Sequence, residues 1–181
     1  MNILDIVDEN ENIIGEDSRE NIHKKGLLHR EIHVWFYTPK DEIIFQLRGK
    51  DKVTRPDLLD ATVGGHVELG DSYEDTAIKE VYEETGVKLT STDLKLITKL
   101  RKSAKDSITG MINNVIRAIY AYKYQGNIKD LKVEGEVAQG FEAWPTKKLV
   151  NGLPDNERKR FIPFMLENKC LEIYKKIEAL L

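Results

Sequence analysis

The sequence predicts a mixed α/β fold with strands on both sides of one central helix. Runs of β-branched and aromatic residues, which favour strands, occur both before residue 64 and after residue 93. Between them, residues 72–86 carry helix-capping signals and apolar residues at helical spacing. The last stretch, 164–181, places its apolar residues near one broad stripe, which predicts a closing helix.

Length and composition indicate an ordinary globular protein. The chain has 181 residues, of which 40% are hydrophobic and 33% charged, and a formal net charge of −3. This length predicts one domain with a buried core, and the slight negative charge argues against a general nucleic-acid binder. The single cysteine, Cys170, excludes an intramolecular disulfide and fits a reducing compartment. Because no apolar run approaches roughly 20 residues and no secretory pattern is visible, we expect a cytoplasmic protein without membrane contact.

The first part of the chain consists of short apolar or aromatic runs separated by turn residues. The expected elements are, in order, a hairpin of 3–7 and 12–15, a helix at 18–25, strands at 31–38 and 42–48, and a brief strand at 61–63. The two longer strands flank a Pro-Lys-Asp turn, so we expect them to be antiparallel neighbours.

The second part of the chain is expected to hold strands at 94–100 and 114–124, joined by a polar loop that contains Gly110. Residues 133–144 are less decided and are compatible with a further strand. A helical tail covers 155–181. Its one apolar stripe suits packing on the domain or on a second subunit, so a homodimer stays open.

The central helix has a clear beginning and end. Ser72, with Asp75 three residues later, reads as a capping box, and Gly86 supplies the stop. A step of about 100° per residue places the apolar residues on one arc suited to packing on a sheet. The neighbouring arc carries three glutamates at offsets of three and four, namely Glu80, Glu83 and Glu84.

Like charges at these offsets repel and weaken an isolated helix. Three carboxylates beside a glycine-rich loop suit a hard divalent cation, which takes oxygen ligands. An acidic, solvent-facing stripe is the simpler interpretation, and it is the better one for three glutamates taken alone. The larger pattern around them reverses that preference.

Residues 65–87 resemble the Nudix box, whose family pattern is G-x5-E-x7-R-E-U-x-E-E-x-G-U, with U aliphatic. The positions that match at the required spacing are Gly65, Glu80, Val81, Glu83, Glu84, Gly86 and Val87. Asp71 stands for the first Glu and Lys79 for the Arg. A Lys ammonium cannot reproduce the planar, paired hydrogen bonds by which the family's Arg holds a catalytic glutamate, although it supplies the charge.

The resemblance implies one Nudix domain over 1–181: an α/β/α sandwich with a mixed sheet, an N-terminal hairpin within 1–16 and the helical tail. It also implies a hydrolase that cleaves the phosphoanhydride of a small-molecule diphosphate linked to another group, with Mg²⁺, or Mn²⁺, as cofactor. The expected metal ligands are Glu83, Glu84 and the Gly64 carbonyl, with Glu80 as a third carboxylate ligand or as the general base. Glu80, Lys79 and Glu83 are therefore the expected catalytic residues.

Residues 4–70 are also similar to the type 1 isopentenyl-diphosphate isomerase branch of the superfamily. The shared features are the VDENxxxIG opening, His23, the LLHR segment, the aromatic strand at 34–37 and GGHVELG. His29 and His66 fall where that branch has histidine metal ligands, and His23 lies near a third. Gly64, however, stands at the position of the isomerase cysteine, and Asn113-Asn114 replaces its downstream acids. An isomerase and a non-catalytic nucleotide-sensing module remain the alternatives.

Several further residues are weaker candidates. Arg48 and Arg55 are placed to reach substrate phosphates, as are Lys50 and Lys52, but a solvated basic loop explains them equally well. His66 is a candidate for a metal or substrate contact, or for a loop-fixing hydrogen bond. A second basic run, Lys99, Arg101, Lys102 and Lys105, is most simply solvated. Spacing does not choose which late acid contributes, if any, among Glu134, Glu136 and Glu142.

Overall fold

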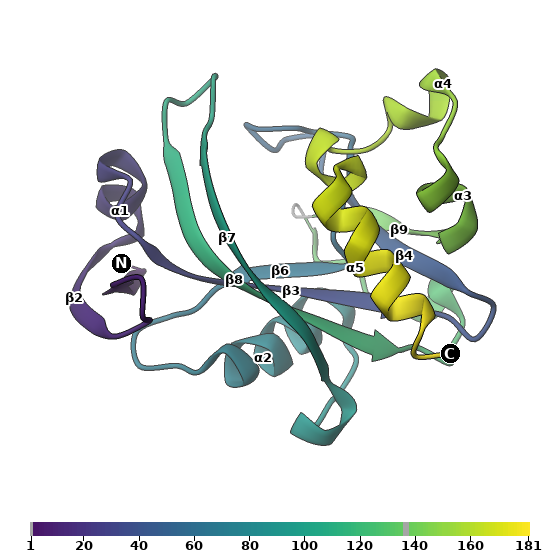
Figure 1. Cartoon of the computed structure of the whole chain (residues 1–181), viewed down its shortest axis with the longest axis horizontal. Coiled ribbons are helices and arrows are strands. Elements are labelled where there is room, and N and C mark those ends of the chain that lie inside the picture. The colour runs from purple at the N-terminus through teal and green to yellow at the C-terminus, as the bar shows by residue number, and fades with distance from the viewer. Residues whose placement is uncertain (1, 136–137) are drawn as a thin grey trace.

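The computed structural model describes residues 2–135 and 138–181 (Figure 1). The strands are β1 Ile3–Val7, β2 Ile13–Ser18, β3 His29–Tyr37, β4 Glu42–Arg48, β5 Leu59–Asp60, β6 Val63–His66, β7 Lys95–Lys105, β8 Ile112–Lys123 and β9 Ala138–Pro145. The helices are α1 Arg19–Lys25, α2 Tyr73–Thr85, α3 Thr146–Asn151, α4 Asp155–Arg158 and α5 Asn168–Glu178, with short 3₁₀ turns at Ser91–Asp93, Ile128–Asp130 and Pro163–Leu166.

The main sheet has seven strands and is mixed, with β3 at its centre. On one side β3 pairs in parallel with β8, which in turn pairs antiparallel with β7. On its other side β3 is shared: residues 31–34 pair with β6, whereas only Phe36 and Tyr37 pair with β4. Strand β4 then leaves β3 and pairs with β5 and β9. The predicted antiparallel neighbours are confirmed, and the divergence of β4 from β6 opens the sheet at this point.

Helices cover both faces of this sheet, as Figure 1 shows for α2 and α5. Alternate residues of β3 supply the two cores, because successive side chains of a strand point to opposite faces. Val34 and Phe36 pack in the core beneath α2, and Trp35 packs in the core beneath α5. The Trp35 and Tyr174 rings lie 5.2 Å apart, so the C-terminal helix packs on its own sheet. The predicted α/β/α arrangement is confirmed.

The N-terminal hairpin forms a separate two-stranded sheet, as predicted, although β2 extends to Ser18. It is anchored at two places. Buried Asp5 accepts hydrogen bonds from Arg30 at 2.7 Å and from the Gly70 amide at 3.1 Å. At the turn of the hairpin, Glu9 and Glu11 form ion pairs with two cations of β7, Arg101 at 3.0 Å and Lys99 at 2.7 Å. The first of these anchors fixes the loop that precedes α2.

Strands β7 and β8 are longer than expected. The sequence predicted a strand that ends at residue 100, but β7 continues to Lys105 and β8 begins at Ile112. Residues 101–105 alternate between exposed and partly buried, so one face of this polar segment is covered. The charged composition of residues 101–105 gave no sign of a strand, because the residues that cover one face of it, such as Phe164 against Lys102, lie far away in the sequence. None of the helices within the described ranges is both long and apolar enough to cross a bilayer.

Candidate active site

Helix α2 begins and ends as the sequence predicts. The Ser72 hydroxyl accepts a hydrogen bond from the Asp75 amide at 3.1 Å, which satisfies one of the free N–H groups of the first turn. Gly86 takes the left-handed conformation (φ 73°), and its N–H donates to the Tyr82 carbonyl. These caps fix where the helix begins and ends, and its buried face sets its rotation relative to the sheet and therefore the directions of its glutamates.

The three glutamates of α2 lie at different depths. The buried face of the helix consists of Tyr73, Thr76, Ala77, Val81, Glu84 and Thr85. Glu84 is at the centre of this face with 6% of its surface exposed, Glu80 lies at the margin, and Glu83 is exposed. The gradation follows from the helical step of about 100°, which carries Glu83 past the margin. Of the three glutamates that were expected to converge, Glu80 and Glu84 face the same cavity, while Glu83 lies beside them in solvent.

A cavity of about 310 Å³ lies where β4 diverges from β6, with α2 on one side. Glu80, Glu84, Gly64 and Gly65 contribute to its wall. Sequence reasoning missed Gln46, whose side-chain amide donates to the Glu84 carboxylate at 2.7 Å. Within the residues that the structure describes, neither Glu80 nor Glu84 forms an ion pair with Lys or Arg. We call this space the acidic cavity.

Burial makes both cavity-facing carboxyl groups unusually basic. Burial, followed by the charge of Glu83, raises the pKa of Glu80 to about 7. Burial also raises the pKa of Glu84 to about 8, against the hydrogen bond from Gln46, which acts to lower it. Among the residues that the structure describes, these two carboxylates have no cationic partner and accept one hydrogen bond, from a neutral amide. They fit a hard divalent cation, whose charge favours their ionised form.

Gly65 leaves room for the Glu80 side chain where β6 and α2 approach each other. A Cβ atom at this position would lie 2.5 Å from both Cδ and Oε1 of Glu80, which is closer than real contacts allow. At Gly64 a Cβ would meet the His33 ring at 3.2 Å, a tight but less severe contact. The backbone of this glycine pair therefore forms part of the cavity wall without side chains between it and the carboxylates.

The two positions that depart from the box pattern lie at the loop 67–72, which precedes α2 and is here called the entrance loop: Asp71 is in this loop and Lys79 is on α2. Lys79 forms an ion pair with Glu68 at 2.6 Å, and both side chains are about 40% exposed. Asp71 is half-buried, and its amide donates to the Glu68 carbonyl at 3.1 Å. Lys79 therefore contacts the loop rather than Glu80 or Glu84, and it holds Glu68, another residue of the acidic-cavity wall.

A second cavity, of about 420 Å³, adjoins the first. The two cavities share the wall residues Arg19, His33, Arg48, Asp60, Gly64, Gly65 and His66. The second cavity also contacts Arg55, Lys102, Lys105 and Arg117. We call it the basic cavity. The expectation that residues 99–105 are merely solvated is wrong for Lys102, which is partly buried in this wall.

Of the residues expected to reach the substrate, Arg48, Arg55 and His66 line these cavities and Lys52 lines the acidic one, whereas Lys50 lines neither. Arg48 donates to the Asp60 carboxylate at 3.1 Å and to the Thr54 and Arg55 carbonyls, so it braces the loop at 49–58. Arg55 contributes to the basic cavity. His66 lies in both walls, and its Nε2 is 3.4 Å from the Glu31 carboxylate.

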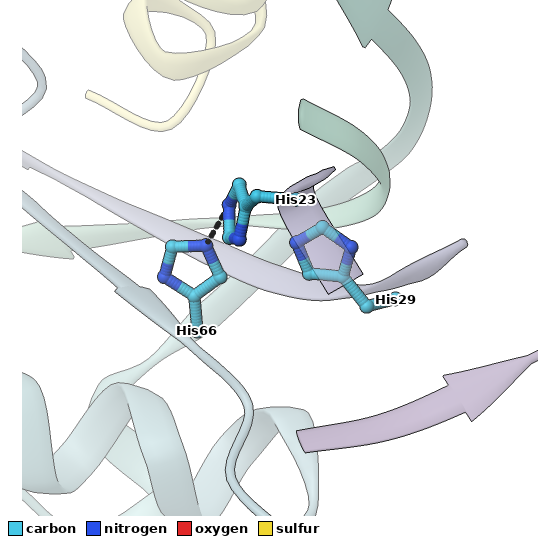
Figure 2. A group of neighbouring side chains, drawn as sticks. All are labelled: His23, His29 and His66. Atoms are coloured by element: carbon cyan, nitrogen blue, oxygen red, sulfur yellow. Dashed lines mark hydrogen bonds between the residues drawn. The ribbon is translucent and has the colours of Figure 1, made fainter. Parts of the chain in front are cut away.

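Three histidines converge beside these cavities. Figure 2 shows His23 of α1, His29 of β3 and His66 of β6 with their rings facing one another. One ring nitrogen from each lies within 4.8 Å of the others, and Nε2 of His23 is 3.2 Å from Nε2 of His66. Buried His29 Nε2 has no partner among the described residues. Burial lowers the pKa of His29 and lowers that of His66 to about 3, so these imidazoles stay neutral, the form that binds metals.

Glu134 and Glu142, two of the three late acids considered, lie in different surroundings, and Cys170 lies away from both cavities. Glu134 lies in the wall of the acidic cavity, whereas Glu142 forms an ion pair with Arg160. Glu136 lies outside the described residues. Cys170 is buried in the core beneath α5, where burial raises the pKa of its thiol to about 12, and it contributes to neither cavity wall.

The fold is a mixed sheet between helical layers, and its capped helix α2 directs Glu80 and Glu84 at the Gly64-Gly65 pair. These features define an α/β protein with an acidic site between α2 and β6. The family model described as "NUDIX domain" matches residues 27–165. This range is well over half of the chain, and the chain therefore belongs to the Nudix family. Among solved structures, the Deinococcus radiodurans protein DR0079 has the same fold, with a TM-score of 0.67 at 18% identity over 96% of this chain and 98% of that one.

Sequence relatives agree with this membership. An uncharacterized Nudix hydrolase of Streptomyces coelicolor is 40% identical over 84 residues, which are 46% of each chain. Another, from Clostridium acetobutylicum, is 31% identical over 140 residues, which are 76% of this chain and 66% of that protein. A Photorhabdus laumondii protein named isopentenyl-diphosphate Delta-isomerase 2 is 32% identical over 46% of this chain and 48% of its own length. The chain thus spans about half to two thirds of the length of these relatives.

Proposed function

We propose that this protein is a metal-dependent hydrolase of the phosphoanhydride bond in a diphosphate linked to another group. The observation that carries the proposal is the pair Glu80 and Glu84, which face one cavity beside Gly64-Gly65 without a cationic partner among the described residues. The relatives named Nudix hydrolases support the same reaction class.

The acidic cavity offers oxygen donors of the kind that Mg²⁺ or Mn²⁺ binds. We assign Glu84, Glu83 and the Gly64 carbonyl as ligands, and Glu134 as the late acid that adds to them. A bound divalent ion neutralises phosphate oxygens and acidifies water. Glu83 is the exposed member of this set, and its charge acts on Glu80, so it lies near enough to contribute at the cavity mouth.

Glu80 is our candidate for the general base. Its carboxyl group lies against Gly65 at the cavity margin, and a pKa of about 7 suits proton transfer near neutral pH. In this role it accepts the proton of the attacking water, while the basic cavity next to it holds the rest of the substrate. Lys79 holds the entrance loop through Glu68, which positions the loop without fixing Glu80 directly.

The isomerase alternative rests on one specific observation, the convergence of His23, His29 and His66, which suits a separate nitrogen-bound metal ion. Against it, Gly64 has no thiol, and Cys170 is buried elsewhere. The acids expected on β8 are also replaced: Asn113 donates to Glu31 at 2.9 Å, and Asn114 donates to the Gly26 carbonyl. A purely sensing module is disfavoured because the box carboxylates are retained.

The test is product release from a panel of nucleoside diphosphate derivatives, with Mg²⁺, with Mn²⁺ and with EDTA. We expect metal-dependent release of phosphate or nucleoside monophosphate, and at least a hundredfold loss of kcat in Glu83→Gln, in line with the roughly 10²–10³ effect of removing one electrostatic contact in an active site. Glu74→Gln, an exposed glutamate of the same helix, is the matched control. Allylic isomer formation from isopentenyl diphosphate, or full activity in Glu83→Gln, would contradict the assignment.

A further inference from the structure

The basic cavity holds more positive charge than its own acids neutralise. Its charged wall residues are Arg19, Arg48, Arg55, Lys102, Lys105 and Arg117 against Glu31, Asp60 and Asp106. Two of the cations are paired inside the wall: Arg117 donates to Glu31 at 2.9 Å, and Arg48 donates to Asp60. Lys102 and Lys105 of β7 and Arg55 of the 49–58 loop are outside these two pairs and face the cavity.

Among the wall cations outside these two ion pairs, Lys102 is the most buried. Its Nζ lies 3.3 Å from the centre of the Phe164 ring, and the side chain is partly buried. Within residues 2–135 and 138–181, no carboxylate lies within 4 Å of Lys102 or of Arg55. Burial, followed by the charge of Arg117, lowers the pKa of Lys102 to about 8, and Arg55 acts in the same direction.

The contact with Phe164 does not account for this arrangement. A cation over an aromatic ring gains roughly 0.5–2 kcal/mol, but a partly desolvated ammonium with no ion-pair partner among the described residues costs a comparable amount or more, even though the charge of Glu31, which is paired with Arg117, favours it. A lysine side chain is long enough to reach solvent when nothing holds it inside. A cavity that retains such a cation is complementary to an anion that enters it.

The position of Lys102 relates this anion to the proposed substrate. The basic and acidic cavities meet at Gly64, Gly65 and His66, so a substrate held at the acidic cavity by its diphosphate extends into the basic one. Met111, Phe164 and Met165 supply an apolar side to that space. With a volume of about 420 Å³, the basic cavity accommodates a group of the size of a sugar.

We propose that the group linked to the diphosphate carries a further anion, a phosphate or a carboxylate, which Lys102 binds. This inference rests on the proposed function and names its substrate class. Lys102 acts as a specificity residue: it contacts the distant end of the substrate and takes no part in breaking the phosphoanhydride bond.

The kinetic test uses substrate pairs that differ by one anionic group: UDP-glucuronate against UDP-glucose for a carboxylate, and NADPH against NADH for a phosphate. In the wild type we expect a higher kcat/KM for the anionic member of at least one pair. Lys102→Met keeps the apolar stem and should lower that kcat/KM about tenfold or more through KM, as loss of one charge-assisted hydrogen bond does. The neutral member should be unaffected.

Lys95→Met is the control, because Lys95 is an exposed residue on the same strand. Equal kcat/KM for both members of each pair in the wild type, or an equal fall for both in Lys102→Met, would overturn the inference. Comparison of the UDP-sugar pair with the dinucleotide pair shows whether the site prefers a carboxylate or a phosphate.

A binding measurement separates this inference from the hydrolase proposal. Calorimetry with inorganic phosphate in EDTA requires neither metal nor turnover. We expect millimolar binding that weakens severalfold in Lys102→Met and not in Lys95→Met. If no diphosphate is hydrolysed but this difference persists, only the hydrolase proposal fails. If phosphate binds both variants equally, or does not bind the wild type, the anion site is refuted.

Discussion

Glu84 shows how one residue combines burial with a chemical role. Its carboxyl group is 6% exposed and accepts a hydrogen bond from neutral Gln46 rather than from a cation. In a protein without metal, such a group prefers its protonated form, because burial disfavours the charge. The same preference makes it a receptive ligand once a cation enters the cavity.

This environment predicts a pH-dependent stability in the metal-free protein. The unfolded carboxyl loses its proton near its ordinary pKa of about 4.3, whereas folded Glu84 keeps it up to about pH 8. Between these values the folded state binds more protons, so the free energy of unfolding falls as pH rises, by on the order of 5 kcal/mol in total. Urea titrations in EDTA at pH 5 and pH 8.5 measure the decline.

Glu84→Gln removes the titrating group and retains an acceptor for Gln46, so most of this decline should disappear. Glu80 titrates in the same direction and accounts for the remainder. Glu74→Gln, on the exposed side of α2, should keep the wild-type pH profile. A Glu84→Gln variant whose stability falls as steeply as the wild type would show that Glu84 is not buried as the structure has it.

At the level of elements, the site depends on how closely β6 and α2 approach. The approach is set locally by the caps of α2 and by Asp5, which fixes the preceding loop through Arg30 and the Gly70 amide. It is tightest at Gly65, where the backbone of β6 meets the Glu80 carboxyl group. The distance between the two elements therefore controls where the candidate base lies.

Gly65→Ala tests this dependence. The added methyl group overlaps Glu80, so either the carboxyl group rotates or β6 moves, and overpacking of this kind costs about 1–3 kcal/mol. We expect a lower midpoint of urea unfolding together with a fall in kcat that exceeds any change in KM. Gly15→Ala is the matched control, since its Cβ would meet only an ordinary contact at 3.7 Å. A wild-type kcat in Gly65→Ala would show that the position of Glu80 does not affect the chemical step.

At the scale of the whole molecule, the cavities arise from the way the sheet opens. Strand β3 pairs with β6 along one half of its edge and with β4 along the other, and the two partners diverge. Helix α2 supplies acids from one face, while the β7–β8 hairpin and the segment before α5 supply Lys102, Arg117 and Phe164. Acidic and basic walls thus meet at the glycine pair.

Because the proposed metal site joins β6 to α2, Mg²⁺ should stabilise the folded protein as a whole. Ligand present at 100 times its Kd adds about 2.7 kcal/mol to the free energy of unfolding, or roughly 5–10 °C in Tm for a chain of this size. Thermal unfolding followed with and without Mg²⁺ measures the shift. Glu84→Gln, which replaces an assigned ligand, should reduce the shift strongly, and Glu74→Gln should not. An identical shift in all three proteins would place the bound Mg²⁺ elsewhere.

Features that depend on neighbours in the chain were predictable. Ser72 and Gly86 delimit α2 through contacts within a few residues, so the helix and the order of its glutamates followed from the sequence. The apolar stripe of α5 likewise predicted a helix with one buried face. The family pattern then favoured a metal site over a solvated stripe for these glutamates, and this assignment stays a prediction.

Tertiary structure alone decided which side chains face the cavities. The Gln46 contact with Glu84 spans 38 residues, and Arg117 meets Glu31 across 86, distances at which local pattern carries no information. Lys102 belongs to a polar run that reads as solvated until α5 and β8 cover one side of it. The sequence by itself therefore determined the central helix and the order of its glutamates. Only the folded chain determined the depth of each acid and which cations line the basic cavity beside them, because burial is set by segments far apart in sequence.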